Sequence, residues 1–207
     1  LPPLTADHLA TAVALRKALK TYDLGHAISF HSRNDSAKLF QRVTKALNGL
    51  RLSKRLKTFR VRSGMSSGSR HEEIKAFERS EPALISNARL LGEGVDVPAI
   101  DLVLFADPKE SKVDIVQAVG RALRKPRGES KKEKGYILAP ILLEDEETDL
   151  ETLEDSAGFE NLVSVLKAMA AVDEEGIRER VHVVLSTPRK GRASRTSVET
   201  EVLMQRL

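Results

Sequence analysis

The chain has 207 residues, of which 41% are hydrophobic and 31% charged, and its formal net charge is +4. This balance excludes wholesale disorder, and the length suffices for a substantial core in one or two domains. No apolar run reaches the roughly 18 residues that a membrane-spanning helix needs, and the absence of cysteine excludes disulfide scaffolds and cysteine-ligated metals. We therefore expect a cytoplasmic protein with an anionic partner and no membrane partner. The chain begins with Leu1 rather than Met, and we expect it to be part of a longer protein.

Strand and helix patterns alternate along the chain as far as Pro140. Helical spacing of apolar side chains predicts helices over 5–22, after Asn34, after Ser69 and after Ser111. Asn34 is a typical N-cap, and Ser69 with Glu72 forms a capping-box pattern. Short apolar runs predict strands at 27–31, 57–62, 83–86, 100–106 and 135–139. This alternation is typical of an α/β fold, a three-layer parallel sheet with helices on both faces.

Composition divides the chain into five parts. We expect a lead-in helix (1–25), an α/β domain (26–140), an acidic linker (141–157), a mostly helical extension (158–185) and a flexible basic tail (186–207). Eight acids between Glu144 and Asp155 mark the linker, because like charges oppose packing. An apolar stripe from Phe159 to Ala170 predicts the helix of the extension. Residues 181–185 fit either a strand or a helix end.

The first candidate for chemistry is the helix predicted after Ser111. At about 100° per residue, Gln117, Arg121 and Arg124 fall on one polar stripe. Two guanidinium groups one turn apart suit a phosphoryl group, because planar donors pair its oxygen atoms in twos. An ordinary solvent-facing amphipathic helix is the alternative.

The second candidate is the segment that directly follows the strand at 83–86. In parallel sheets, ligands sit beyond the carboxyl ends of the strands. Gly92 and Gly94 allow close backbone approach, Asp96 suits a ribose hydroxyl, and Asn87 suits a phosphate. A turn with structural glycines is the alternative.

The third candidate combines the ends of the strands at 27–31 and 57–62. His31-Ser32-Arg33 and Arg62-Ser63-Gly64 place small polar and basic groups at the sheet edge. Such groups suit a nucleic-acid backbone, where phosphate contacts fix register without reading sequence. Plain loop chemistry is the alternative.

Several chemistries find no support in the sequence. There is no G-x-x-x-x-G-K-[ST] pattern, hence no phosphate-binding P-loop. The apolar run that ends at Glu144 and Asp145 resembles a strand followed by a magnesium-binding acidic pair. Because these two residues belong to a long run of acids, we do not interpret them as a magnesium site. The five histidines show no metal-ligand spacing, so no residue is assigned to a metal. Aromatic residues, at 4%, are too sparse for a base-stacking platform.

Taken together and in this order, the candidate segments resemble the C-terminal RecA-like domain of superfamily 2 helicases. Residues 27–33 resemble motif IV of that domain. Residues 61–64, together with Arg70 and Phe77, resemble the auxiliary motif that follows motif IV. Residues 84–98 resemble motif V, and residues 117–124 resemble motif VI. The sequences of segments 93–98, 107–111 and 114–121 are similar to those of bacterial helicase-like proteins related to type I, type III and type ISP restriction enzymes. Motif VI begins with Gln117 rather than His, which fits this group better than the DEAD-box RNA helicases.

The resemblance implies roles for individual residues. Arg121 and Arg124 would be arginine fingers on the γ-phosphate of ATP, and Gln117 would couple nucleotide to nucleic acid. Glu93, Gly94 and Asp96 would lie near the ribose and the motor cleft. The residues that would face the nucleic-acid backbone, expected to be DNA, are Ser32, Arg33, Gly64, Ser86, Asn87 and Ala88. ATP and Mg²⁺ would be held mainly by an N-terminal RecA-like domain of the same polypeptide.

These expectations define the predicted function. The chain is expected to be the second motor domain of an ATP-dependent helicase or translocase, and to be inactive as an ATPase alone because it carries no P-loop. The alternatives are a non-motor nucleic-acid-binding module with the same fold and a protein-interaction domain with incidental basic runs.

Overall fold

The computed structural model describes residues 3–50, 54–62, 64–87, 100–107, 135–138, 183–187 and 194–198. Among these, five strands form one sheet in the order β2-β3-β1-β4-β5, and every neighbouring pair is parallel. The strands are β1 (His26–Phe30), β2 (Lys57–Val61), β3 (Ala83–Asn87), β4 (Leu102–Phe105) and β5 (Tyr136–Leu138). The predicted α/β class is confirmed, and each predicted strand is found within about two residues of its expected bounds.

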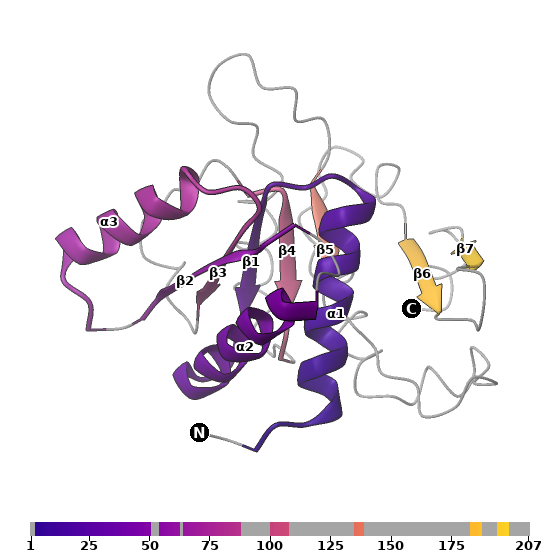
Figure 1. Cartoon of the computed structure of the whole chain (residues 1–207), viewed down its shortest axis with the longest axis horizontal. Helices are drawn as coiled ribbons and strands as arrows, with labels where there is room; N and C mark the ends of the chain where they lie inside the picture. Colours follow the sequence, from indigo (N-terminus) through magenta and orange to yellow (C-terminus); the bar gives the residue numbers. More distant parts are fainter. Residues whose placement is uncertain are drawn as a thin grey trace, which may run out of the picture.

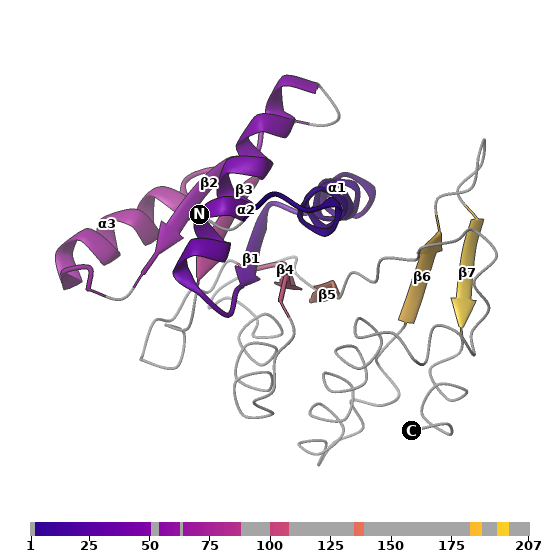
Figure 2. The ribbon, with the colours of Figure 1, turned by 90° about the horizontal axis from the view of Figure 1, so that it is seen from below.

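In the part of the chain that the structure describes, three helices accompany the sheet: α1 (Ala6–Thr21), α2 (Asn34–Ala46), which continues into the 3-10 turn η1 (Leu47–Leu50), and α3 (Ser67–Glu78). Figures 1 and 2 show α1 and α2 together over one face of the sheet, and α3 beside β2. Within the described residues, no helix is long and apolar enough to cross a membrane.

The two faces of the sheet are separated by the alternation of side chains along each strand. One face packs under α1 and α2 and holds the main core cluster. Its strand and helix residues are Ala12, Leu15, Leu19, Ala27, Leu39, Phe40, Val43, Leu84, Leu102 and Leu104, joined by Leu47 and Leu56. On the other face, Phe77 of α3 is fully buried and packs edge-on against His26 and Phe59, with ring centroids 5.0 and 6.0 Å apart.

The chain begins the sheet at its central strand, β1, and then fills the two sides of β1 in turn. β2 and β3 lie on one side of β1, and β4 and β5 on the other, so the chain crosses over β1 between β3 and β4. Phe30 at the end of β1 pairs with both Asn87 and Phe105, and Asn87 pairs with Val61. The carboxyl ends of four strands therefore meet in one row at a topological switch point, where open α/β sheets bind ligands.

Two helix starts differ from the sequence prediction. Asn34 is the first residue of α2, and Arg33 stands at the N-cap position without a side-chain capping bond. α3 is capped by Ser66, whose hydroxyl accepts from the N–H of Ser69, so the predicted capping box of Ser69 and Glu72 is wrong. Glu73 rather than Glu72 is engaged: its carboxylate accepts from the N–H of Arg60 in β2 at 3.0 Å.

The C-terminal part also differs from prediction where it is described. β6 (Val183–Thr187) pairs antiparallel with β7 (Ser194–Val198), although a flexible tail was expected from residue 186. Val183–Thr187 contains three β-branched side chains and Ser194–Val198 two, and β-branched side chains favour extended backbone. The predicted helices after Ser111 and over 159–170, and the acidic linker, lie outside the described residues.

Candidate functional site

The carboxyl edge of the sheet brings the predicted nucleic-acid segments together. In Figure 1 the arrows of β1 and β4 point to the lower side, and α2 begins there. Register pairing of Val61, Asn87, Phe30 and Phe105 aligns the ends of β2, β3, β1 and β4. The predicted residues Ser32, Arg33, Gly64, Ser86 and Asn87 all lie at or directly after these strand ends.

The turn between β1 and α2 is anchored by a residue from the next strand. The backbone N–H and the hydroxyl of Ser32 both donate to Oδ2 of Asp107, each at 2.8 Å. Asp107 follows β4, so this pair ties the end of β4 to the start of α2. Arg33, the next residue, is exposed. The turn thus presents one guanidinium group beside the positive end of a helix, which favours an anion.

A chain of buried polar groups lies directly beneath this turn. The hydroxyl of Ser29 donates to that of Ser86 across β1 and β3 at 3.0 Å, and Nε2 of His31 lies 2.9 Å from the Ser29 hydroxyl. Because Ser29 already donates to Ser86, its oxygen accepts from a protonated Nε2 of His31. The predicted site residue Ser86 is fully buried and its hydroxyl accepts from Ser29, while its contact with a nucleic-acid backbone stays a prediction.

The imidazole of His31 is held neutral. It is 2% exposed, and its ring lies 5.1 Å from that of Phe40 in α2. Burial lowers the pKa of His31 to about 4, whereas the Asp107 carboxylate acts to raise it and His8 adds to the lowering. His31 therefore serves as a neutral hydrogen-bond donor at neutral pH, not as a cation for phosphate.

The end of β2 supplies a second exposed turn. Arg62 is exposed, and its N–H donates to Sδ of Met65 at 3.4 Å. Gly64 is exposed and adopts a φ of +82°, which strongly favours glycine. The capped start of α3 follows at Ser66. Arg62 and Arg33 are thus two exposed cations on turns that follow strands of the same parallel sheet.

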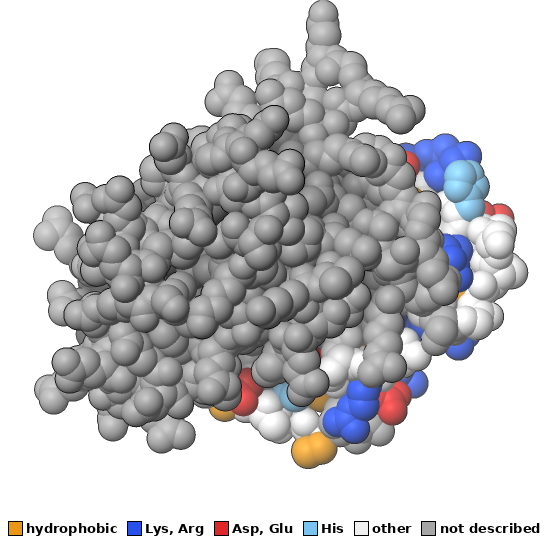
Figure 3. Space-filling model, turned by 180° about the vertical axis from the view of Figure 1, so that it is seen from behind, with side chains coloured by type: hydrophobic (Ala, Val, Ile, Leu, Met, Phe, Trp, Pro, Cys, Tyr) orange, Lys and Arg blue, Asp and Glu red, His pale blue; other side chains and the backbone are white. Residues whose placement is uncertain are grey.

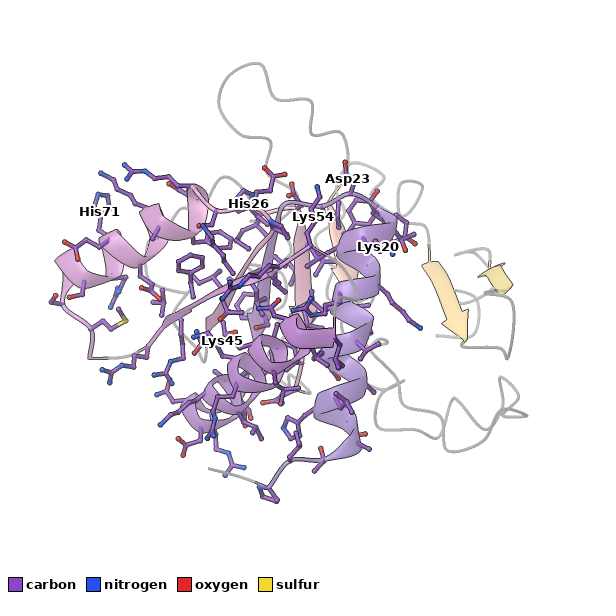
Figure 4. The ribbon with its side chains drawn as sticks, viewed as in Figure 1. Lys20, Asp23, His26, Lys45, Lys54 and His71 are labelled. Carbon is purple, nitrogen blue, oxygen red and sulfur yellow. The ribbon has the colours of Figure 1, made fainter. Side chains whose placement is uncertain are left out.

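Basic side chains also occur on the outer face of α3, away from the turns. Figure 3 shows blue Lys and Arg side chains and a pale blue His along the margin where α3 lies, and Figure 4 places His71 on this helix. His71, Lys75 and Arg79 are exposed. Their positions along the helix are those of an ordinary solvated face.

Several predicted site residues lie outside the described part of the chain. They are Ala88, Glu93, Gly94, Asp96, Gln117, Arg121 and Arg124. Asn87 is placed by its backbone, as the last residue of β3. The nucleotide-facing part of the predicted site therefore stays a prediction.

The site also contains a residue that the sequence analysis did not assign. Asp107 entered the sequence analysis only as part of segment 107–111 in the family resemblance, without a role, yet it accepts from both donors of Ser32. An acidic residue directly after a buried apolar strand was the available signal. Among the described residues, no group of three or more His, Cys, Asp or Glu side chains is arranged to hold a metal ion.

Two exposed basic side chains lie at this edge of the sheet, Arg33 after β1 and Arg62 after β2. Acidic side chains lie there as well: Asp35 is exposed in the first turn of α2, and Asp107 contacts the β1–α2 turn. Guanidinium groups bind phosphate oxygens in pairs, and cations placed on rigid turns lose little freedom on binding.

Comparison with known proteins agrees with this arrangement. A curated relative, "Probable helicase A859L" of African swine fever virus (isolate Pig/Kenya/KEN-50/1950), is 32% identical over 93 residues, which is 45% of this chain and 10% of the relative. The same protein from the isolate Tick/Malawi/Lil 20-1/1983 matches equally. The chain thus spans about a tenth of the length of the curated relatives it matches.

Solved structures give a similar picture. The ATP-dependent type ISP restriction-modification enzyme LlaBIII, solved bound to DNA, is 28% identical with a TM-score of 0.71, and the match covers 83% of this chain and 12% of that one. Dbp5 of S. cerevisiae, solved bound to RNA and ADP BeF3, is 15% identical with a TM-score of 0.53, covering 80% of this chain and 38% of that one. The second likeness concerns the fold alone.

A family model decides the assignment. The model of the helicase conserved C-terminal domain matches residues 11–126, which is more than half of the chain and includes all of β1 to β4. The five-stranded parallel sheet is the RecA-like fold of that domain. The resemblance to superfamily 2 helicases, and within them to the type ISP restriction enzymes, is confirmed. This chain belongs to the helicase conserved C-terminal domain family.

Proposed function

We propose that this chain is the second motor domain of an ATP-dependent helicase or translocase that acts on DNA. The observation that carries the proposal is the single row of strand ends, where Ser32, Arg33 and Gly64 come together with the end of β3. DNA is favoured over RNA because the structure with the higher TM-score, that of the type ISP enzyme, was solved on DNA.

The sheet edge and the predicted motif VI helix would serve two ligands. The turns after β1 and β2 would hold the nucleic-acid backbone through Arg33, Arg62 and backbone groups. Arg121 and Arg124 would reach a triphosphate held by a partner RecA-like domain of the same polypeptide, with Gln117 between the two ligands. Glu93, Gly94 and Asp96 would lie near the ribose.

ATP and Mg²⁺ fit this arrangement only with a partner domain. Arg33 and Arg62 at the two turns suit phosphate oxygens, and the described residues offer no carboxylate cluster for a metal. Mg²⁺ would neutralise charge on the transferring phosphoryl group. The residues of this chain would orient the triphosphate and stabilise its charge, while the metal would be held elsewhere.

Arginine fingers explain how such a half-site contributes to catalysis. Phosphoryl transfer depends on positioning and charge stabilisation, and a finger contributes about 10³–10⁵ in rate. Insertion and withdrawal of Arg121 and Arg124, as the two domains close and open, would couple hydrolysis to movement along a strand.

The test uses the intact motor protein. Arg121→Ala and Arg124→Ala should lower ATP hydrolysis by about 10³-fold or more, with ATP affinity nearly unchanged. Arg127→Ala is the matched control, since it removes the same charge just beyond Pro126 and should leave turnover unchanged. Wild-type turnover in both finger variants would remove the assignment.

A second measurement separates a motor from a passive nucleic-acid module. This chain alone should show no ATPase activity, and the intact motor should hydrolyse ATP faster when DNA is added. A non-motor module would bind DNA with strong salt dependence and show no hydrolysis in any context. An ATP hydrolysis rate of the intact protein that is the same with and without DNA would also contradict the proposal.

A further inference from the structure

Both donors of Ser32 are already engaged within the protein. Its N–H and its hydroxyl lie 2.8 Å from the same oxygen of Asp107. An incoming phosphate would have to displace the Asp107 side chain from both donors, and this exchange of one oxygen acceptor for another adds no hydrogen bond. Direct phosphate binding by Ser32 is therefore disfavoured.

Arg33 is in the opposite situation. It is exposed, and as the N-cap residue of α2 it makes no side-chain capping bond. Its backbone is fixed, because its carbonyl accepts from the N–H of Ala37 at 3.1 Å. A fixed backbone with an outward guanidinium suits a direct phosphate contact.

The turn is held from the opposite side as well. His31 lies 2.9 Å from Ser29, which in turn donates to Ser86 of β3, and the His31 ring packs on Phe40 of α2. Residues from β1, β3, β4 and α2 thus fix three consecutive positions, 31 to 33. The arrangement leaves Arg33 as the exposed end of a rigid unit.

We propose that Asp107 is a positioning residue for nucleic-acid binding, which fixes the β1–α2 turn through both donors of Ser32 so that Arg33 makes the phosphate contact. This inference rests on the proposed function, because it concerns the same edge of the sheet. Preorganisation is the physical basis: a turn that is ordered before binding loses little conformational freedom when the phosphate arrives.

Two opposing effects of Asp107 have different sizes. Its negative charge repels a neighbouring phosphate, but salt screens exposed charges, and we expect this repulsion to change affinity by about threefold or less. Loss of two hydrogen bonds to a carboxylate frees the turn and should cost about tenfold in affinity. Removal of Asp107 should therefore weaken binding, although it removes a repulsive charge.

The experiment measures fluorescence anisotropy of a short labelled DNA strand with this chain at several salt concentrations. Asp107→Ala should bind about tenfold more weakly with an unchanged salt slope, and Asp107→Asn, which keeps an acceptor oxygen, should stay within about threefold of wild type. Arg33→Ala should bind more weakly and lower the salt slope by about one phosphate contact. Binding by Asp107→Ala that equals or exceeds wild type would overturn the inference.

Asp23→Asn is the matched control for the charge change. Asp23 is exposed and lies at the end of α1, at the upper edge in Figure 4, opposite the carboxyl edge of the sheet. Its φ of 48° is one that asparagine adopts readily. DNA affinity of this variant should equal that of wild type.

A double-mutant cycle tests the mechanism. Ser32→Ala should weaken binding in the wild-type background and add nothing in the Asp107→Ala background, because both changes release the same turn. Additive losses would assign Ser32 a direct phosphate contact and overturn the inference.

Amide hydrogen exchange at Ser32 tests the positioning role of Asp107 separately from the proposed function of the chain. Asp107→Ala should speed exchange of this amide in the absence of DNA, while Asp23→Asn should not. Unchanged exchange would overturn the inference whatever the affinities are. Failure of the wild-type chain to bind DNA, with Ser32 exchange accelerated as expected, would count against the proposed function alone.

Discussion

The guanidinium group of Arg16 in α1 donates to the carbonyl oxygen of Thr44 in α2 at 3.0 Å. Arg16 is 2% exposed, and it also donates to the side-chain oxygen of Asn48. That oxygen accepts from the N–H of Leu56, and the Asn48 amide donates back to the Leu56 carbonyl. One buried side chain therefore joins α1, the end of α2 and the segment leading into β2.

Replacement of Arg16 should destabilise the domain strongly. Arg16→Ala removes the donors of a buried carbonyl and leaves a cavity, which together should cost about 2–4 kcal/mol in the free energy of unfolding. Urea denaturation followed by circular dichroism measures this. The exposed neighbour Lys17 is the matched control, and Lys17→Ala should change stability by about 0.5 kcal/mol or less. Similar losses in both variants would show that the network is not stabilising.

The stability of the domain should depend on pH through His31. Burial lowers its pKa from 6.5 to about 4, so between these values the unfolded chain binds a proton that the folded chain does not. Stability contributed by neutral His31 is complete above pH 6.5 and is lost as the pH falls toward 4, by about 1.4 kcal/mol per pH unit. Urea titrations at several pH values, with His31→Gln compared to wild type, isolate this slope.

His71 provides the control for the pH experiment. It is exposed on α3, and His71→Gln should leave the slope between pH 6.5 and 4 unchanged. A slope that persists in His31→Gln would assign the effect to other groups.

The buried serine pair should show strong coupling. Ser29→Ala leaves the Nε2 proton of His31 and the hydroxyl of Ser86 without this partner, at a cost of about 1–3 kcal/mol. Adding Ser86→Ala should cost much less than it does in the wild-type background, because its partner is already gone. Denaturation of the two single variants and the double variant measures the coupling, and strict additivity would contradict it.

Two glycines near the start of α3 should respond in opposite directions to alanine. Gly64 has a φ of +82°, so Gly64→Ala should destabilise by about 1 kcal/mol, even though no atom lies within 4 Å of the added Cβ. Gly68 is helical with equally open surroundings, and Gly68→Ala should stabilise by about 0.4–1 kcal/mol. Thermal unfolding of both variants checks the signs, and equal signs would contradict the backbone argument.

Much of the fold was predictable because its strands are short apolar runs. Ile28, Leu84 and Val103 stand in segments that differ sharply from the polar chain around them, and the strands were found close to their expected bounds. Helix starts were less predictable where hydroxyl residues cluster. Ser66 and Ser69 are both good caps by residue type, and the structure uses Ser66, whose hydroxyl accepts from the N–H of Ser69.

The sequence predicted where in the fold the candidate site lies, but it did not predict which side chains hydrogen-bond there. Strand ends identified Ser32 and Ser86 as candidates, since the carboxyl edge follows from the alternation of elements. Their partners are 75 and 57 residues away in sequence, so no local pattern reveals that Asp107 and Ser29 engage them. Sequence reasoning assigned both serines to the nucleic acid, whereas the fold uses their hydroxyls internally.

The hydroxyl pair between β1 and β3 also selects the alignment of these two strands. A shift of two residues would keep the inward and outward sides of both strands, so the apolar pattern alone does not oppose it. Such a shift would set Ser29 opposite Leu84 and break the hydrogen bond between the hydroxyls of Ser29 and Ser86, at a cost of about 1–3 kcal/mol. The hydrogen bond between two buried hydroxyls therefore favours the native register of β1 against β3, in addition to the packing of the apolar side chains.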